Sequence, residues 1–235
     1  MAIYRLYRGT AFPDPESAEP DGLLAVGGDL SERRLVAAYA SGIFPWYSAG
    51  SPILWWSPNP RMVLFPGEVH VSRSLRRTVL SGRYQVRADT AFSRVIRRCA
   101  EKERPDQDGT WIVPEMIEAY ERLHEGGVAH SVEAFEGGAL VGGLYGVSLG
   151  AVFFGESMFA DKSDASKVAF ATLVEWLRRR DFDLVDCQVE TDHLRRFGAR
   201  PISRAEFRTR LAAALAKPTL RGPWELGEGS SPPGL

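Results

Sequence analysis

The sequence predicts an α+β fold in which a small N-terminal domain precedes a larger domain with a mainly antiparallel sheet flanked by helices. Two observations in the second half of the chain carry this prediction. Three strand-like segments with short connections predict an antiparallel meander over 131–135, 139–147 and 151–159. A helical apolar stripe over 165–179 and another strand over 182–185 follow it. A strand, a helix and a strand in this order usually place both strands in one sheet.

Residues 1–62 are predicted to form the N-terminal domain. Ser31 can cap a short helix that ends near Gly42. Three tryptophans then lie close together, interleaved with proline: Trp46, Trp55 and Trp56. Such a rigid aromatic surface can stack on a nucleotide base. For at least two of the three, a hydrophobic seam between domains is the favoured interpretation.

Residues 63–220 are predicted to form the larger domain, and 221–235 a disordered tail rich in glycine, serine and proline. The larger domain begins with a strand at 62–65. Its helices are predicted to start at Ser72, at Asp89 or Thr90, at Pro114 and at Ser203, where Glu206 completes a capping box.

Composition excludes several classes of protein. No run approaches the ~20 apolar residues of a membrane helix, and the N-terminus has no signal-peptide pattern. The two cysteines, Cys99 and Cys187, show no metal-ligand spacing, so a cytoplasmic protein without a structural zinc site is expected. The net charge is −1, yet arginines gather locally, at 73–77, 94–98, 178–180 and 195–196. Such clusters can follow a nucleic-acid backbone, although an ion-paired, solvated helix face is the simpler interpretation of any one of them.

Three polar residues are predicted to converge. Glu156 lies in a strand between large apolar side chains, where an isolated charge would be costly. Asp186 and Gln188 follow the next strand of the predicted parallel pair, and functional groups gather at such strand ends. On position alone, a paired structural carboxylate with a solvated Asp-x-Gln is an equal alternative.

The order of elements resembles the acyl-transferring fold of the N-acetyltransferases, a GNAT-like domain. Enzymes of that fold that use acetyl-CoA usually carry a glycine-rich loop after the central strand, and its amides bind pyrophosphate. Residues 160–167 contain no glycine. The sequence therefore indicates an acyl donor other than CoA.

Eleven short motifs, in order, resemble those of the leucyl/phenylalanyl-tRNA–protein transferases, and the resemblance runs over about 12–211. The motifs are DGLLA (21–25), GGDL (27–30), GIFPW (42–46), LWWSP (54–58), GTW (109–111), AHS (129–131), GGLYG (142–146), GESMF (155–159), ASK (165–167), DCQ (186–188) and DH (192–193). The resemblance implies transfer of Leu or Phe, with Met as a further donor, from aminoacyl-tRNA to the N-terminal Arg or Lys of a protein, which marks it for degradation under the N-end rule.

The resemblance also implies roles for residues of the site. Trp46 and Trp111 would flank the 3′-terminal adenosine. An apolar pocket would hold the donor side chain, lined by Leu144, Phe153, Met158, Phe170, Leu173 and Val185. Ser166 and Lys167, at a helix start, would meet a phosphate. Thr191 stands where the family commonly has Asn, so its substrate contact is in doubt.

For catalysis, we expect Gln188, oriented and polarised by Asp186, to hydrogen-bond the attacking amine. A proton shuttle through the ribose hydroxyl of the tRNA is the alternative. Glu156 would hold the aminoacyl group or the amine at the pocket mouth. His193 is interpreted as structural, because nucleophilic catalysis would need a nearby Ser or Cys.

The expected partners are Leu-tRNA, Phe-tRNA and proteins with N-terminal Arg or Lys. The protein itself is expected to be a monomer that uses no cofactor and contacts no membrane. Two other functions stay open. One is a CoA-dependent N-acyltransferase and the other is a non-catalytic binder of aminoacyl-tRNA.

Overall fold

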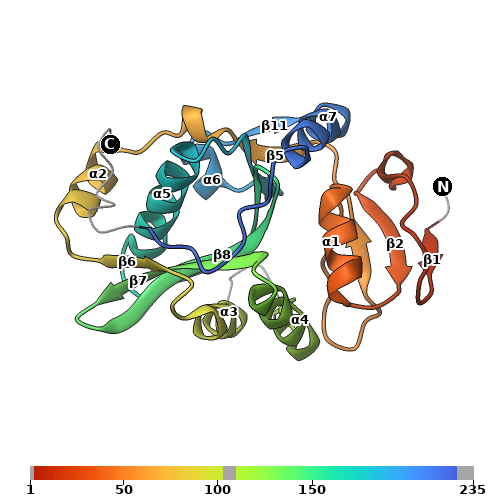
Figure 1. Ribbon diagram of the computed structural model, residues 1–235, viewed down its shortest axis with the longest axis horizontal. Coiled ribbons are helices and arrows are strands. Elements are labelled where there is room, and N and C mark those ends of the chain that lie inside the picture. The colour runs from red at the N-terminus through yellow and green to blue at the C-terminus, as the bar shows by residue number, and fades with distance from the viewer. Residues whose placement is uncertain (1–2, 103–109, 227–235) are drawn as a thin grey trace.

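Two sheets organise the chain. The computed structural model describes residues 3–102 and 110–226. The smaller sheet has the order β1-β2-β4-β3 and lies at one end of the molecule with helix α1 (Figure 1). Its elements are β1 (Tyr4–Leu6), β2 (Leu23–Gly27), α1 (Glu32–Ala40), β3 (Phe44–Pro45) and β4 (Leu54–Trp56), with a short 3-10 turn at Pro15–Ser17.

The larger sheet has seven strands in the order β11-β5-β10-β9-β8-β7-β6. These are β5 (Arg61–Leu64), β6 (Gln85–Ala88), β7 (Ala129–Glu136), β8 (Ala139–Leu149), β9 (Val152–Ala160), β10 (Leu184–Gln188) and β11 (Arg200–Ile202). Each neighbouring pair is antiparallel except β9 and β10, which run parallel and are joined through helix α5 (Ala165–Arg178). The predicted α+β class, meander and parallel pair are confirmed.

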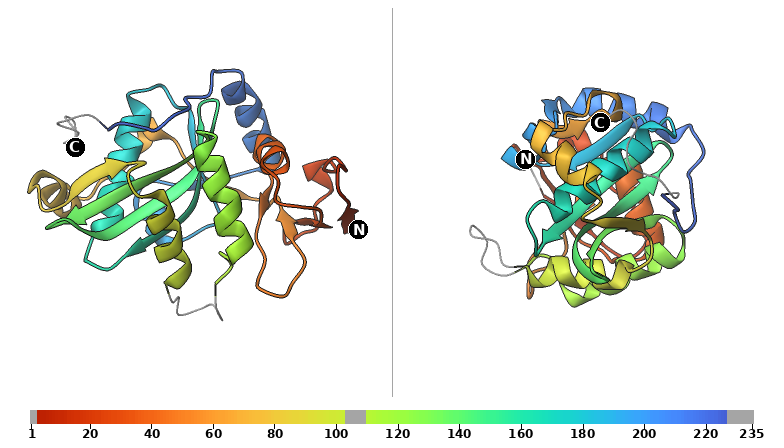
Figure 2. Two further views of the ribbon diagram at one scale, coloured as in Figure 1. Left: turned by 60° about the horizontal axis from the view of Figure 1, so that its bottom comes forward. Right: turned by 90° about the vertical axis from the view of Figure 1, so that its left-hand side faces the viewer.

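Helices cover both faces of this sheet (Figure 2). Helix α5 lies on one face, with α2 (Arg73–Leu80) beside it, while α3 (Phe92–Glu101) and α4 (Pro114–Glu125) lie on the other. Two adjacent glycines of β8 allow this close approach. A Cβ on Gly142 would lie 2.6 Å from that of Ala165 in α5, and one on Gly143 would lie 3.3 Å from Val95 in α3. Consecutive strand residues point to opposite faces, so each glycine admits a different helix.

Helix starts follow the predicted capping at two positions. Ser72 accepts a hydrogen bond from the backbone of Leu75, and Ser203 accepts one from Glu206 at the start of α7 (Arg204–Leu215). Ser31 precedes α1 but makes no side-chain cap bond. The helix predicted to start at Asp89 or Thr90 begins instead at Phe92 (α3), because Asp89 accepts hydrogen bonds from the backbone of Ser131 and from His130.

The N-terminal sheet and the larger sheet share one core. A continuous cluster of buried side chains runs from Trp55 and Tyr39 to Tyr120 and Phe154 on the α4 side of the large sheet. Helix α1 contacts α4 and α7 as well as β8. The N-terminal unit is therefore packed onto the rest of the chain rather than set apart by a linker.

The chain after α7 crosses the sheet toward α2 as an extended segment, dark blue in Figure 1. Trp224 in this segment is 3% exposed and stacks on His130 with 3.7 Å between ring centroids. Residues 221–226 of the expected tail are thus held in place, because Trp224 fills an aromatic cluster that the sequence pattern does not reveal. Residues 227–235 lie outside the described part of the chain. None of the described helices is long and apolar enough to span a membrane.

Candidate active site

A cavity of about 490 Å³ opens where the two parallel strands part. Strands β9 and β10 pair from Val152 with Leu184 to Phe154 with Asp186. Beyond this point β9 continues through Gly155, while β10 bends at an irregularity between Asp186 and Gln188. The backbone pairing ends there, and the gap between the strand ends becomes the cavity. This is the sheet edge where the sequence predicted that polar groups would converge.

Nearly all predicted site residues line this cavity. They are Trp46, Trp111, Leu144, Phe153, Glu156, Met158, Ser166, Lys167, Phe170, Val185, Asp186, Gln188 and Thr191. Leu173 does not line it: this side chain is fully buried in the core under α5, one turn beyond Phe170. Sequence reasoning missed the lining contributed by Phe44, Ser157, Cys187 and Leu194, whose apolar or small side chains carry no distinguishing pattern.

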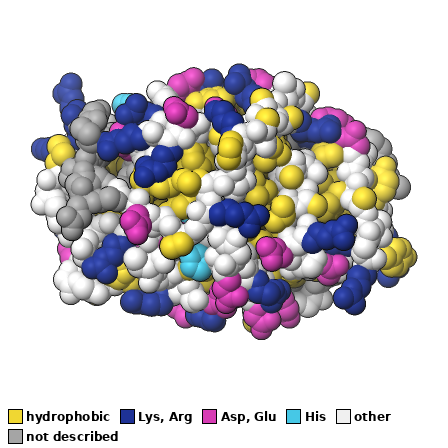
Figure 3. Space-filling model, viewed as in Figure 1, with side chains coloured by type: hydrophobic (Ala, Val, Ile, Leu, Met, Phe, Trp, Pro, Cys, Tyr) yellow, Lys and Arg dark blue, Asp and Glu magenta, His cyan; other side chains and the backbone are white. Residues whose placement is uncertain are grey.

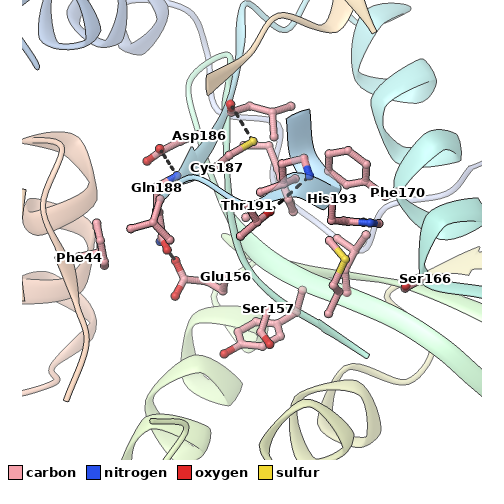
Figure 4. Close-up of a pocket in the computed structure, with 18 of the residues that line it drawn as sticks. Phe44, Glu156, Ser157, Ser166, Phe170, Asp186, Cys187, Gln188, Thr191 and His193 are labelled. Atoms are coloured by element: carbon pink, nitrogen blue, oxygen red, sulfur yellow. Dashed lines mark hydrogen bonds between the residues drawn. The ribbon is translucent and has the colours of Figure 1, made fainter. Parts of the chain in front are cut away.

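The apolar end of the cavity is lined by one hydrophobic cluster, made by Leu144, Phe153, Met158, Phe170 and Val185, whereas Glu156 and Gln188 form a hydrogen-bonded polar end. Figure 4 shows Phe170 and Ser166 on one side, and Gln188, Glu156 and Phe44 on the other. Phe44 comes from the N-terminal unit, so both parts of the chain build the wall.

Two tryptophans border the cavity. Trp46 is 37% exposed and its ring lies 5.8 Å from that of Trp56, whose Nε1 donates to the Trp46 carbonyl. Trp111 stands on the segment before α4 and is partly buried. Trp55, by contrast, is fully buried in the core. Of the three clustered tryptophans, Trp46 is the one that borders the cavity.

Glu156 stands at the centre of a hydrogen-bond chain. Gln188 Nε2 donates to its Oε1 at 2.7 Å, and the Tyr120 hydroxyl donates to its Oε2 at 3.0 Å. Tyr120 in turn shares a hydrogen bond with Tyr39 of α1. Burial, together with the nearby charge of Asp186, raises the pKa of Glu156 to about 7. The carboxyl can therefore exchange a proton near neutral pH.

Asp186 is fully buried and is bound by Arg61. The Arg61 Nε and Nη2 donate to its two oxygens at 2.8 and 2.7 Å. Asp186 Oδ1 also accepts the backbone N–H of Gln188 at 2.9 Å. We expected Asp186 to polarise the Gln188 carboxamide, but the two side chains share no hydrogen bond. Asp186 binds the backbone N–H of Gln188, and Glu156 orients the Gln188 side chain.

Ser166 and Lys167 lie at the start of α5, as predicted. The residue before this helix, Asp164, has φ +63° and makes no side-chain cap bond. Lys167 Nζ instead donates to Asp164 Oδ1 at 2.7 Å. A phosphate bound here would replace the Asp164 carboxylate as the partner of the Lys167 ammonium.

Thr191 and His193 border the cavity from the short helix α6 (Asp192–Arg196). The Thr191 hydroxyl accepts from the backbone of Leu194 at 3.3 Å, so it serves as a helix cap. His193 meets the Phe197 ring edge-on, and burial lowers its pKa, with Lys167 and Arg196 adding to the effect. Burial likewise raises the pKa of the Cys187 thiol. A neutral imidazole and a protonated thiol fit a structural interpretation of His193 better than a nucleophilic dyad.

The arginine clusters divide between the two faces of the sheet. Those of α2 (Arg73, Arg76 and Arg77) are exposed on the α5 side, and those of α3 (Arg94, Arg97 and Arg98) on the other. Arg97 and Arg98 form ion pairs with Glu121 and Asp161. Basic and acidic side chains are interspersed over the face in Figure 3 rather than gathered in one patch.

Comparisons with known proteins agree on one family. The family model described as "Leucyl/phenylalanyl-tRNA protein transferase" matches residues 63–212, and the model of its N-terminal domain matches 28–59. The chain is 68% identical over 234 residues to a leucyl/phenylalanyl-tRNA–protein transferase of Anaeromyxobacter sp. (strain Fw109-5), covering 100% of both chains. It is 60% identical over 221 residues to that of Myxococcus xanthus (strain DK1622), covering 94% of each.

Similarity to solved structures is much weaker. L-PGS from Bacillus licheniformis matches with a TM-score of 0.40 and 8% identity, over 72% of this chain and 54% of that one. A GCN5-related N-acetyltransferase from Kribbella flavida matches with a TM-score of 0.35 and 12% identity, over 72% and 60%. These values carry no argument about function.

Proposed function

The chain belongs to the leucyl/phenylalanyl-tRNA–protein transferase family and is an aminoacyltransferase, and from this premise we propose which groups it joins. The donor is Leu or Phe, with Met as a further donor, carried as an ester on tRNA. The acceptor is the α-amine of a protein that begins with Arg or Lys. The product carries a new N-terminal residue that marks the protein for degradation under the N-end rule.

One observation carries this proposal: an apolar cavity ends at Glu156 and Gln188 and has Trp46 and Trp111 at its border. The donor side chain would occupy the apolar end, and the terminal adenosine would lie between the tryptophans. Burial in such a cavity rejects polar side chains, because their desolvation is not repaid. It separates apolar side chains by only about 1–3 kcal/mol per methylene, which fits the use of both Leu and Phe.

The reaction is aminolysis of an ester. The amine nitrogen attacks the carbonyl carbon, the bond to the ribose oxygen breaks, and the amine loses a proton while the ribose hydroxyl regains one. An α-amine has a pKa of about 8, so roughly a tenth of it is already neutral at pH 7. Positioning can therefore supply most of the acceleration, for which orientation offers ~7–11 kcal/mol.

Gln188 and Glu156 divide the handling of the amine. Because Gln188 Nε2 donates to Glu156, the carboxamide oxygen is the group that Gln188 can offer to the amine N–H. A carboxamide is not a base at neutral pH. Glu156, with its pKa near that of the amine, is matched to receive the proton. A shuttle through the ribose hydroxyl, with Gln188 and Asp186 only positioning, is the competing route.

We assign tRNA contacts to basic groups near the cavity and on α2. Lys167 and the start of α5 would meet a phosphate close to the terminal adenosine. Arg73, Arg76 and Arg77 would contact the acceptor stem without reading its sequence. The arginines of α3 lie across the sheet, and two of them already form ion pairs, so they are weaker choices for the same stem.

Two competing functions are separated by simple observations. A CoA-dependent acyltransferase needs amides to cradle pyrophosphate, and residues 160–167 contain no glycine for that loop. Binding of acetyl-CoA would favour it. A non-catalytic binder of aminoacyl-tRNA would bind the donor tightly without transferring it. We expect the enzyme to act as a monomer in the cytoplasm.

Mass spectrometry of a peptide product tests the proposal. Purified protein, Phe-tRNA and a peptide beginning with Arg should give a product heavier by one Phe residue, at the N-terminus by fragmentation. The same peptide with acetylated Arg, and one beginning with Ala, should give none. Tight tRNA binding without addition would instead indicate a binder, and addition to the Ala peptide would refute the acceptor assignment.

A further inference from the structure

Arg61 is a buried cation next to the site. The proposed function gives this side chain no role. It is the first residue of β5 and is 1% exposed. Two of its nitrogens bind Asp186, while Nη1 has no hydrogen-bond partner among the described residues. A buried ion pair contributes little net stability, because desolvation offsets the attraction, and an apolar pair of similar volume is often as stable. Stability alone therefore does not account for Arg61.

Two aromatic rings lie against its guanidinium. The Arg61 Cζ lies 4.8 Å from the ring centre of Phe44 and 4.7 Å from that of Phe207. Phe44 belongs to the N-terminal unit and borders the cavity, whereas Phe207 belongs to α7. Stacked rings favour a flat guanidinium over an ammonium. The guanidinium that holds Asp186 is therefore packed against both parts of the chain.

Asp186 passes this constraint to Gln188. Its Oδ1 receives one bond from Arg61 and one from the backbone N–H of Gln188. Gln188 has φ +60°, a left-handed conformation that costs a residue with a Cβ about 1 kcal/mol or more. It also stands at the strand irregularity opposite Met62. The bond from the N–H to Asp186 opposes the return of this backbone to regular strand geometry.

We propose that Arg61 is a positioning residue for the transfer reaction. By clamping Asp186, it keeps the left-handed turn at Gln188, and this turn aims the carboxamide at Glu156 and at the amine. The inference rests on the proposed function for its kinetic consequence. Its structural part, the restraint of the Gln188 N–H by Arg61, stands without it.

The test compares two buried arginines. Arg61→Lys keeps the charge but loses the fork and the flat stacking surface. Arg204→Lys is the matched control, because Arg204 is also buried, at 7% exposure, and binds Ser57 and Glu16 away from the cavity. In steady-state transfer of Phe to an Arg peptide, Arg61→Lys should lower kcat about tenfold or more with little change in KM for tRNA or peptide. Arg204→Lys should leave kcat unchanged, even where its Tm falls equally.

Hydrogen exchange gives a readout that does not need transfer. The amide of Gln188, followed in a fragment spanning 184–190, should exchange faster in Arg61→Lys than in the wild type or in Arg204→Lys. If the wild type transfers nothing, the proposed function fails, and exchange still decides the role of Arg61. An unchanged kcat together with unchanged exchange overturns the inference, as does an equal kcat loss in both variants.

A second variant covers the case in which Arg61→Lys does not fold. Phe207→Leu removes one covering ring, leaves the ion pair intact and does not border the cavity. It should lower kcat several-fold with KM unchanged and speed exchange at Gln188. A kcat and a Gln188 exchange rate that both match the wild type in Phe207→Leu would overturn the inference.

Discussion

Glu156 is the carboxyl group of the site whose pKa lies near neutrality. Burial raises its pKa to about 7 from the ordinary 4.5, so the folded protein holds this proton more tightly than the unfolded chain. The stability contributed by the group is complete below pH 4.5 and is lost as the pH rises through 7. We expect activity to change in the opposite direction, because in the proposed reaction only the carboxylate can receive the proton of the amine.

Glu156→Gln should therefore change the pH profile as well as the rate. In the wild type, the single-turnover rate should rise as the pH passes through about 7. In the variant, the rate should be lower and this inflection absent, leaving only the titration of the acceptor amine near pH 8. The variant should melt no lower than the wild type at pH 8, since it no longer buries a charge. A persisting inflection, or a large loss of Tm, would make Glu156 a structural residue.

Gln188→Glu tests whether the carboxamide itself is needed. The new carboxylate would lie within hydrogen-bond distance of Glu156, where Gln188 Nε2 now stands at 2.7 Å. Two carboxylates so close must share a proton, which removes the proton acceptor. We expect the single-turnover rate to fall about 10²-fold, with tRNA affinity unchanged. An unaltered rate would favour the shuttle through the ribose hydroxyl.

At the scale of elements, the segment after α7 is a structural support of the sheet. Trp224 contacts the rings of His130, Trp176 and Phe153, and its backbone N–H donates to Asp89 at 2.6 Å. Phe153 borders the cavity, so this segment packs behind the wall that we propose holds the donor.

Trp224→Ala should lower the free energy of unfolding by about 3–5 kcal/mol, as large-to-small changes in a core do. Leu220→Ala, in the same segment but 40% exposed, should change it by less than about 0.5 kcal/mol. Urea denaturation measures both. Equal effects would mean that Trp224 does not anchor the segment.

Helix α2 is the element that we predict to bind tRNA. Replacing Arg73, Arg76 and Arg77 by Gln should weaken binding of deacylated tRNA. The slope of the logarithm of the binding constant against the logarithm of the salt concentration should become less negative by ~0.7–0.9 for each lost phosphate contact. Arg179→Gln is the control, because Arg179 is ion-paired with Glu175. If binding of tRNA by the unaltered enzyme does not depend on salt, these arginines do not contact its phosphates.

At the scale of the whole molecule, the sequence was most informative where pattern and function coincide. The pattern of 131–159 predicted three strands, and the strand–helix–strand order placed Glu156, Asp186 and Gln188 at one sheet edge. The pairing of Arg61 with Asp186 was not predictable, because 125 positions separate them and an arginine before a strand carries no such signal. Leu173 was assigned to the pocket, but helix α5 turns it into the core.

The shared core also has a functional meaning. The N-terminal unit supplies Phe44 and Trp46 to the cavity and Tyr39 to the hydrogen-bond chain of Glu156. Periodicity within each segment could not show this, since it reports which face is apolar and not what covers it. The site therefore exists only when both units are packed together.

The central claim is that the cavity between β9 and β10 holds the donor side chain, and filling it is the most direct measurement. Met158→Trp adds bulk at a half-buried lining position, and Val86→Trp introduces the same side chain at the sheet edge, outside the lining. Single-turnover transfer of Phe should fall at least about tenfold in Met158→Trp, with affinity for deacylated tRNA and Tm both matching those of Val86→Trp. Undiminished transfer of Phe by a folded Met158→Trp enzyme would contradict this account, because the donor side chain would then have to lie elsewhere.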